Sequence, residues 1–392
     1  MKRLLKFFSS LRLTIVLLSF ALLVVFFGTL DQVHLGIYEA QKRYFESWLA
    51  LWFYPAEWPG GNSLQTFFIP LPGGFLLGIL LIINLICAHF THFRLSWQKI
   101  GIACIHTGLL FLIVSGFLTG MLQEESQMAL DKGQAVRFSQ NMRQAELVII
   151  DKSDPYMDYV TSIPTSLLEE RKTVTDPNLP FSLTTLHYYP NAELGLQAQN
   201  PEAVPTLATA GAGAKMGLVV FPQPLSRQDN VVNAQTAYIT INTDEGPLGT
   251  WLVSSILDSD RFPPQQFDYQ GKTYEIALRF KRTYYPFSLS LIEFTHERYP
   301  GTNVPKHFSS LVQLVNPEHS EDRQVLIYMN HPLRYSDYTF FQASFVPGGN
   351  TSILQVVKNP IRSLPYYAVL LVGLGLFFQF STYLILFLKK RE

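Results

Sequence analysis

The chain has 392 residues, of which 48% are hydrophobic and only 15% are charged. Its 30 basic and 30 acidic side chains leave no formal net charge, so the composition indicates neither a nucleic-acid-binding protein nor an acidic disordered tail. With only Cys87 and Cys104, both in apolar stretches, the chain lacks a disulfide framework and a four-thiolate metal site. It also has no CxxCH sequence. This composition is typical of a membrane protein with a substantial water-soluble part.

Four apolar stretches are long enough to cross a hydrocarbon core of about 30 Å, which needs about 20 helical residues. The first is longer than the apolar region of a signal peptide and lacks a small-x-small cleavage pattern, so we expect an uncleaved anchor. The sequence therefore predicts four transmembrane helices, which cover residues 13–30, 67–88, 100–120 and 364–388.

Basic residues in the short loops set the expected orientation of these helices. They precede the first helix, lie between the second and third, and follow the fourth, whereas residues 31–66 mix acidic and basic side chains. We therefore expect both termini in the cytoplasm and residues 121–362 outside it. The basic residues are Lys2, Arg3, Lys6, Arg12, Arg94, Lys99, Lys389, Lys390 and Arg391.

The first outer loop contains IYEAQKRYFESWLALW, residues 37–52. Its aromatic and aliphatic side chains fall near helical spacing, with charged side chains on the other faces, which predicts an amphipathic helix. At a membrane surface the aromatic rings suit the headgroup region. The alternative is a helix that packs on the outer domain without contact to lipid.

Three histidines belong to the second and third predicted helices. His106 lies inside the third, in GIACIHTGLLFLIVSGFLTG, residues 101–120. An ionisable group in a membrane helix is costly and is a functional candidate by default, although it can also serve as a buried hydrogen-bonding residue between helices. His89 and His92 close the second helix on one helical face, where they would either approach the same leaflet as His106 or remain solvated among headgroups.

Small residues at the other ends of these two helices predict close helix packing, at Gly74-x-x-x-Gly78 and Gly116-x-x-x-Gly120. Cys87 and Cys104 are assigned no role, because buried apolar thiols are usually inert.

The segment between helices three and four is expected to be mostly β. Strand-like runs separated by Pro, Gly, Asn and Asp, without intervening helical patterns, favour an antiparallel sandwich or a barrel-like domain. Residues 200–214 (NPEAVPTLATAGAGA) are expected to form a flexible loop between two β subdomains. The runs are residues 145–150, 181–189, 236–242, 273–285, 287–294, 309–315, 323–329 and 339–345.

Several apparent motifs carry no function. GAGAKMG, residues 211–217, has a misplaced third glycine and no βαβ unit around it, so it does not predict dinucleotide binding. His296-Glu297 lacks the second histidine of a zinc-protease helix. The remaining outer histidines have no ligand spacing and are interpreted as surface or core residues: His187, His307, His319 and His331.

The predicted fold class is therefore membrane α plus β, with a large, mainly antiparallel β domain between transmembrane helices three and four and outside the cytoplasm. Residues 1–120 form the N-terminal membrane domain, including the amphipathic helix at 37–52. Residues 121–362 form the β-rich domain, and residues 363–392 form the last helix and a basic tail.

Taken together, these segments resemble the ResB family, also called CcsB, of system II cytochrome c biogenesis. The resemblance rests on four stretches: FFSSLRLTIVLLSFALLVVFFGTL (residues 7–30), GIYEAQKRYFESW (36–48), IHTGLLFLIVSG (105–116) and MNHPLRYSDYTFFQASFVPGGNTSILQVVKNP (329–360). It covers both ends of the chain and all four predicted helices, while the middle of the β domain is less distinctive.

The resemblance implies a subunit of a haem-delivery and haem-attachment complex in the bacterial inner membrane. Its implied partners are a WWD-bearing membrane protein of the ResC or CcsA type, apocytochrome c, haem and the thiol-disulfide reductant of the apocytochrome. This chain has no WWD sequence, because its five tryptophans are never adjacent. It is therefore expected to be half of a cytochrome c haem synthase and not catalytic alone.

For the site residues, the family's histidine-bearing helix matches the helix of His106. The resemblance therefore implies that His106 is an axial ligand of a transiently bound b-type haem, with an apolar pocket for the porphyrin. His89 and His92 are the further candidates for haem binding. Residues 330–345 are predicted to form a turn and a strand close to the fourth helix, and we expect them to help present apocytochrome or haem.

A function of a different class is also compatible with the residues. The chain would then be a non-enzymatic membrane anchor or scaffold whose β domain docks a partner protein, with the histidines serving only helix packing. Haem bound to the purified complex distinguishes the two functions.

Overall fold

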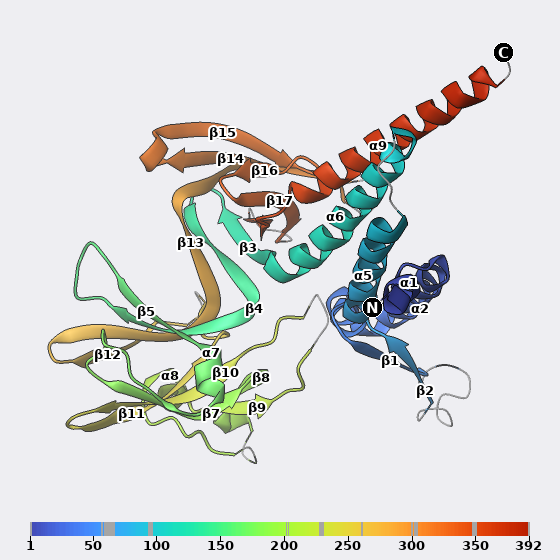
Figure 1. The fold of residues 1–392 in the computed structure, drawn as a ribbon. Helices are drawn as coiled ribbons and strands as arrows, with labels where there is room; N and C mark the ends of the chain where they lie inside the picture. Colours follow the sequence, from blue (N-terminus) through green and yellow to red (C-terminus); the bar gives the residue numbers. More distant parts are fainter. Residues whose placement is uncertain are drawn as a thin grey trace. The chain divides into compact units, whose positions relative to one another are not determined.

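The structure is a computed structural model of the chain and describes residues 2–55, 58, 67–92, 97–200, 202, 204–226, 231–259, 262–298, 301, 305–346 and 351–390. Arg94 and Arg391 of the predicted basic loops lie outside the described residues. The chain divides into two compact units, each described by itself (Figure 1). The helical unit contains residues 1–124 and 358–392, and the β unit contains residues 125–226 and 230–357.

Four helices of the described residues are long and apolar enough to cross a membrane, as the sequence predicts. The second begins at Gly74, later than predicted, because residues 68–72 form a strand and prolines 70 and 72 lack the N–H that a helix needs. The long helices are α2 (Leu11–Leu35), α5 (Gly74–His92), α6 (Ile100–Leu122) and α9 (Leu364–Lys389), accompanied by α1 (Lys2–Phe8) and the short η2 (Trp97–Lys99).

The break between α1 and α2 is held by Asn84 of α5. Its side-chain amide donates to the backbone carbonyl of Phe8 at 2.6 Å and accepts from the hydroxyl of Thr14 at 2.7 Å. Ser10 caps the start of α2 by accepting from the backbone N–H of Leu13. An interruption between two helices leaves backbone N–H and C=O groups without partners, and the side chains of Asn84 and Ser10 supply partners here.

The predicted amphipathic helix at 37–52 is correct only in its first half. Residues 37–45 are helical, as α3 (Ile37–Ala40) followed by the π-helical η1 (Gln41–Phe45). The chain then forms β1 (Leu49–Phe53), which pairs antiparallel with β2 (Phe68–Pro72). Burial alternates along β1, and Trp52, only 4% exposed, packs against the ring of Phe27 at 4.8 Å between centroids. This distant pairing and packing override the helical spacing of the sequence.

Helices α6 and α9 pack at very close range and antiparallel to each other. A Cβ atom added at Gly101 would lie 2.7 Å from the Gly375 carbonyl oxygen, and one added at Gly108 would lie 2.9 Å from that of Ala368. Of the four predicted packing glycines, Gly74 is closely approached, since an added Cβ would clash with the Phe45 carbonyl oxygen. At the other three, Gly78, Gly116 and Gly120, an added Cβ would meet nothing within 4 Å. The glycines that join α6 and α9 were not among those predicted.

The β unit contains a ten-stranded antiparallel sheet in the described residues, which confirms the large antiparallel β domain (Figure 1). Its main order is β15-β14-β13-β4-β3-β18-β17-β16, with β5 added to β4 and β12 added to β13. The strands are β3 (Glu124–Asp131), β4 (Ala135–Asp151), β5 (Tyr159–Pro164), β12 (Gln265–Tyr269), β13 (Lys272–Arg298), β14 (Pro305–Asn316), β15 (Glu321–Tyr328), β16 (Leu333–Tyr335), β17 (Tyr338–Phe345) and β18 (Thr351–Lys358).

Smaller elements complete this unit. A four-stranded sheet has the order β11-β10-β7-β6, and β8 pairs with β9. They comprise β6 (Thr173–Val174), β7 (Ser182–Tyr189), β8 (Ala192–Leu196), β9 (Leu218–Pro222), β10 (Thr236–Thr243) and β11 (Gly246–Ser254), with the short helices α7 (Thr165–Glu169), η3 (Gln197–Gln199), α8 (Gly211–Met216) and η4 (Pro317–His319). Helix α8 occupies the end of the predicted flexible loop at 200–214.

One strand serves two hydrophobic cores. The first half of β13 contributes Tyr274, Ile276 and Leu278 to a core between the two larger sheets. The second half contributes residues 285, 287, 289 and 291 to a core enclosed by β3 and β14 to β18. The two predicted strands at 273–285 and 287–294 are therefore one continuous strand of 27 residues. Its pairing with β4 shifts register between Tyr284 and Leu289, around Pro286, where a proline is tolerated.

Candidate functional site

His106 lies in the first half of α6, six positions after Ile100 and thus about 9 Å along the helix axis. Its side chain is half-buried. At about 100° per residue, His106 is rotated by about 140° from Gly101 and about 160° from Gly108, the two glycines that contact α9. The imidazole therefore belongs to the side of α6 that faces away from α9.

Helix α5 brings His89 to this side of α6. The two helices pack antiparallel, with Phe75 of α5 against Phe117 of α6 at 5.7 Å between ring centroids. His89 and His106 lie toward the opposite ends of these helices from that pair. The antiparallel packing therefore places two of the three histidines that the sequence singles out toward the same end of the α5–α6 pair.

His92 is the last residue of α5, and its side chain lies outside what the structure describes. Three residues of α-helix rotate it by about 60° from His89 and carry it about 4.5 Å further along the axis. Its backbone therefore continues the helical face on which His89 lies.

The start of α6 is closed on its other side by Gln379 of α9. The Gln379 Oε1 atom accepts a hydrogen bond from the backbone N–H of Ile102 at 3.2 Å. The first N–H groups of a helix have no partner within that helix, so this contact satisfies one of them where water is scarce. Within the described residues, no group of three or more His, Cys, Asp or Glu side chains gathers as a metal site would require.

A second polar cluster, which the sequence did not predict, lies where η1 meets α2. The hydroxyl of the fully buried Tyr44 donates to Asp31 Oδ2 at 2.6 Å, and Arg43 approaches the same oxygen at 3.5 Å. Burial, together with the hydrogen bond to Asp31, raises the pKa of the Tyr44 phenol above its ordinary value, so the phenol remains a donor.

The π-helical turn explains this geometry. Its wider ring alters the spacing of successive side chains, and π-turns often occur at functional positions. Asp31 and Arg43 also line a cavity of about 230 Å³ with His34, Leu35, Phe53, Tyr54 and Pro55. In the sequence, Asp31 is a single acidic residue near the end of an apolar run. Its partners Tyr44 and Arg43 belong to the π-helical turn η1, which no periodicity of the sequence identifies.

Comparison with known proteins identifies the second half of the β unit. Residues 269–357, from the end of β12 through β18, match the model of the ResB-like family. Over that segment, the chain is similar to the ResB-like family. In addition, 91 residues are 40% identical to Protein NrfI of Wolinella succinogenes. That match covers 23% of this chain but only 10% of the relative, so the chain corresponds to about a tenth of its length.

The ResB-like segment includes residues 330–345, which the sequence predicted as a turn and a strand. They form a turn followed by β16 and β17, and β18 then ends six positions before the start of α9. The turn and the strand structure predicted for this stretch are confirmed, while its closeness to α9 stays a prediction. The ResB-like segment does not include α5 and α6, so the roles of His89, His92 and His106 stay predictions.

Proposed function

We propose that this chain acts in cytochrome c maturation as the ResB-like subunit of a membrane complex that delivers haem to apocytochrome c. The observation that carries this proposal is the ResB-like match over residues 269–357 in a chain that also has four membrane-type helices. The β unit would then lie outside the cytoplasm, and the WWD-bearing partner of the ResC or CcsA type would complete the complex in the inner membrane.

Haem is the cargo in this function, and its iron would be held by His106. The residues present fit this group. A neutral imidazole on an apolar helix is a strong axial base, and the apolar side chains of α5 and α6 would limit the access of water to a porphyrin bound there. His89, toward the same end of the α5–α6 pair, would share the site or receive haem before His106 does.

The scaffold function has one observation in its favour. The ResB-like match lies entirely in the β unit and omits the helices that carry the histidines. A family defined by its outer domain is compatible with a protein whose main task is docking apocytochrome. Haem bound to the complex in an His106-dependent way distinguishes haem delivery from docking.

The test replaces His106 with Ala in the complex formed with its partner. Ala is a strong helix former, so α6 should still insert, while haem content and the yield of holocytochrome c should each fall about tenfold or more. Haem content is measured by its Soret absorbance and normalised to the amount of the chain in the membrane. Exogenous imidazole should restore part of the haem if the lost group is an iron ligand.

A matched control is His319→Ala, because His319 is an exposed histidine in η4 of the β unit. This variant should keep wild-type haem and cytochrome yield. Wild-type haem content in His106→Ala would contradict ligation by His106. If cytochrome maturation also stayed intact while the complex held no haem, docking would be the supported function.

A further inference from the structure

A hollow of about 550 Å³ lies on the β unit where β4, β5 and β13 run side by side. The residues that line it come from these strands and from the loops before β5 and β12, and all of them belong to the β unit. Three are cationic (Lys152, Arg279 and Arg282) and three are acidic (Asp158, Asp258 and Glu275), with Ile150, Val160, Ala277 and Tyr284 completing the wall.

This hollow lies on the sheet face opposite the first core. Successive side chains of a strand point to opposite faces, so Ile276 and Leu278 enter the core while Ala277 and Arg279 point outward. Ile150, Val160 and Ala277 supply an apolar surface within a charged rim. The outward face of a sheet normally carries solvated side chains, yet Ile150, Glu146 and Arg279 on this face are all buried.

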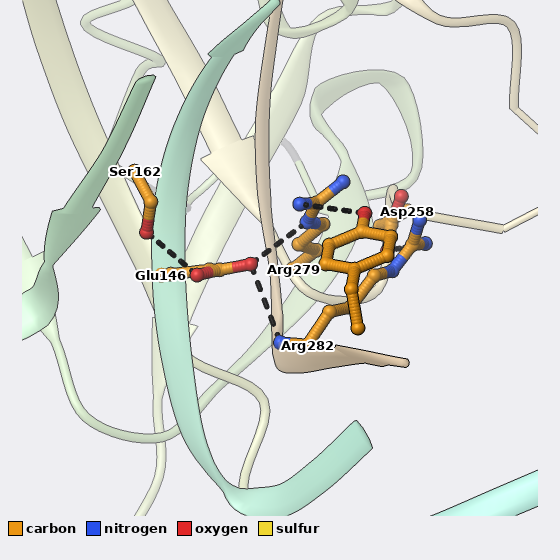
Figure 2. Close-up of polar contacts among 6 residues, drawn as sticks. Glu146, Ser162, Asp258, Arg279 and Arg282 are labelled. Atoms are coloured by element: carbon orange, nitrogen blue, oxygen red, sulfur yellow. Dashed lines mark hydrogen bonds and ion pairs between the residues drawn. The ribbon is translucent and has the colours of Figure 1, made fainter. Parts of the chain in front are cut away.

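Arg279 and Glu146 form a buried ion pair at one end of the hollow. Arg279 is only 4% exposed, and its Nε donates to Glu146 Oε1 at 3.0 Å (Figure 2). The same carboxylate accepts from the hydroxyl of Ser162 at 2.6 Å and from the backbone N–H of Arg282 at 3.3 Å. Glu146 is thereby engaged by three donors, and it has little capacity left for a second guanidinium.

Arg282 is the second guanidinium, and it is incompletely paired. Its Cζ atom lies 4.4 Å from the centroid of the Phe138 ring. Its Nη2 atom is 3.6 Å from Asp258 Oδ2, which is beyond ordinary hydrogen-bond distance. The Arg282 side chain is 22% exposed, so the guanidinium can be reached from the hollow. Because Nη2 is too far from Asp258 for a hydrogen bond, an incoming acceptor would find a donor here.

We propose that this hollow binds the carboxylate of a small organic acid with an apolar body. The carboxylate would accept mainly from Arg282, whose guanidinium presents donors in a planar fork that matches a carboxylate, while Arg279 is engaged by Glu146 and by the Tyr284 hydroxyl and adds positive charge nearby. The apolar body would lie on Ile150, Val160 and Ala277.

The acidic groups of the rim limit where the carboxylate can sit. Glu275 lies four residues from Arg279 on β13, about 13 Å along the strand, which exceeds the screening length of about 8 Å at physiological salt. Asp158 is paired with Lys152 at 2.9 Å. Asp258 is the group that competes for Arg282, so the ligand would displace it or share the guanidinium with it.

Two sources supply this chemistry: a porphyrin propionate and an aliphatic acid. The porphyrin source rests on the proposed function, whereas the aliphatic source does not. The probes are therefore metal-free protoporphyrin IX, its dimethyl ester, and valerate, each titrated into the detergent-solubilised full chain. Because the porphyrin carries no iron, its binding is independent of axial ligation by His106.

The test variant is Arg282→Gln, which keeps much of the side chain but removes the charge and the fork. Binding of valerate, followed by saturation-transfer NMR, should weaken about tenfold, because a hydrogen bond to a charged group is lost. Asp258→Asn should instead tighten binding by about two- to fivefold, since the competing carboxylate is gone. A purely structural role for Arg282 would not produce this opposite pair of effects.

The control is Arg323→Gln, which removes an arginine that is 48% exposed and pairs with Glu321 on β15. It should leave both probes unaffected. Protoporphyrin IX bound in preference to its dimethyl ester, with loss in Arg282→Gln, assigns the site to a porphyrin propionate. Valerate binding that depends on Arg282, without porphyrin binding, supports a carboxylate site for another acid. If neither acid binds in an Arg282-dependent way, the proposal is wrong, whatever the outcome at His106.

Discussion

Where its helices start or break, the helical unit uses buried polar side chains to satisfy backbone groups, whereas in the β unit several buried polar side chains pair with each other. In the helical unit, Asn84 donates to the backbone carbonyl of Phe8, and Gln379 accepts from the backbone N–H of Ile102. In the β unit, buried polar side chains bond to each other, as Arg279 does with Glu146 and as Ser310 does with Ser352 at 2.7 Å.

The difference follows from where each fold leaves its backbone groups unpaired. Helix breaks and helix starts expose N–H and C=O groups, and in hydrocarbon no water can satisfy them. A sheet pairs most of its backbone along the ladder, so a polar side chain buried there finds its partners mainly among other side chains. The contrast holds for the ends of the long helices and not for Tyr44 and Asp31, two side chains of the helical unit that bond to each other.

The largest change in stability is expected from breaking the Arg279–Glu146 ion pair in the β unit. Arg279→Met leaves Glu146 buried without its cation and should lower the free energy of unfolding by about 3–5 kcal/mol. The measurement is urea unfolding of the solubilised chain, followed by circular dichroism.

The matched variant is Arg279→Met combined with Glu146→Leu, which removes both charges. Most of the lost stability should return, because the uncompensated carboxylate is gone. A double variant as unstable as Arg279→Met alone would show that the pair's charge is not the cause.

An intermediate effect is expected from the glycine contact between α6 and α9. A side chain at Gly375 would place Cβ 2.7 Å from the backbone oxygen of Gly101, so Gly375→Val should destabilise the helical unit by about 1–3 kcal/mol. The control is Gly373→Val on the same helix, where an added Cβ meets nothing within 4 Å. Thermal unfolding in detergent compares the two, and equal melting temperatures would contradict the close packing.

The smallest change in stability is expected from the Lys272–Asp151 pair at the surface, whose contribution depends on pH. Hydrogen bonds from Lys272, at 2.7 Å, and from Ser153 lower the pKa of Asp151 to about 2. This carboxyl is therefore more acidic in the folded protein, and its contribution to stability is present above about pH 4 and is lost between about pH 4 and pH 2.

Asp151→Asn should remove this part of the acid dependence, at a cost of at most about 1 kcal/mol near neutral pH. Urea unfolding at a series of pH values measures the change. Asp337→Asn, at an exposed aspartate in the turn before β17, serves as the control and should keep the wild-type slope. An unchanged slope in Asp151→Asn would contradict the pKa assignment.

Much of the helical unit could be predicted from the sequence, because long apolar runs have few alternative structures. The prediction at 37–52 was wrong after Phe45, where the pairing of β1 with β2 decides the structure and cannot be read from local spacing. Three of the four predicted packing glycines were also misassigned, and Gly101 and Gly108 were missed because they matter only through the approach of α9, more than 250 residues later in the chain.

The candidate sites show the same limit. His106 stands out in an apolar run, so the sequence alone identifies it. The hollow depends on Glu146 and Arg279, which are 133 positions apart and meet only through the register of β4 and β13. No motif marks either residue. Arg282 reaches Glu146 only because the pairing of β13 with β4 shifts register between Phe280 and Lys281.

The long strand β13 has a consequence for how the protein is made. Its first half pairs with β4, whose Leu147, Val148 and Ile149 leave the ribosome well before their partners. Until then β4 offers an unpaired apolar edge to other chains, and pairings so distant in sequence form slowly. When β13 is complete, it contributes to both cores at once. Because the second core also needs β14 to β18, which follow β13 in the chain, the β unit is expected to complete its folding only after most of it has been synthesised.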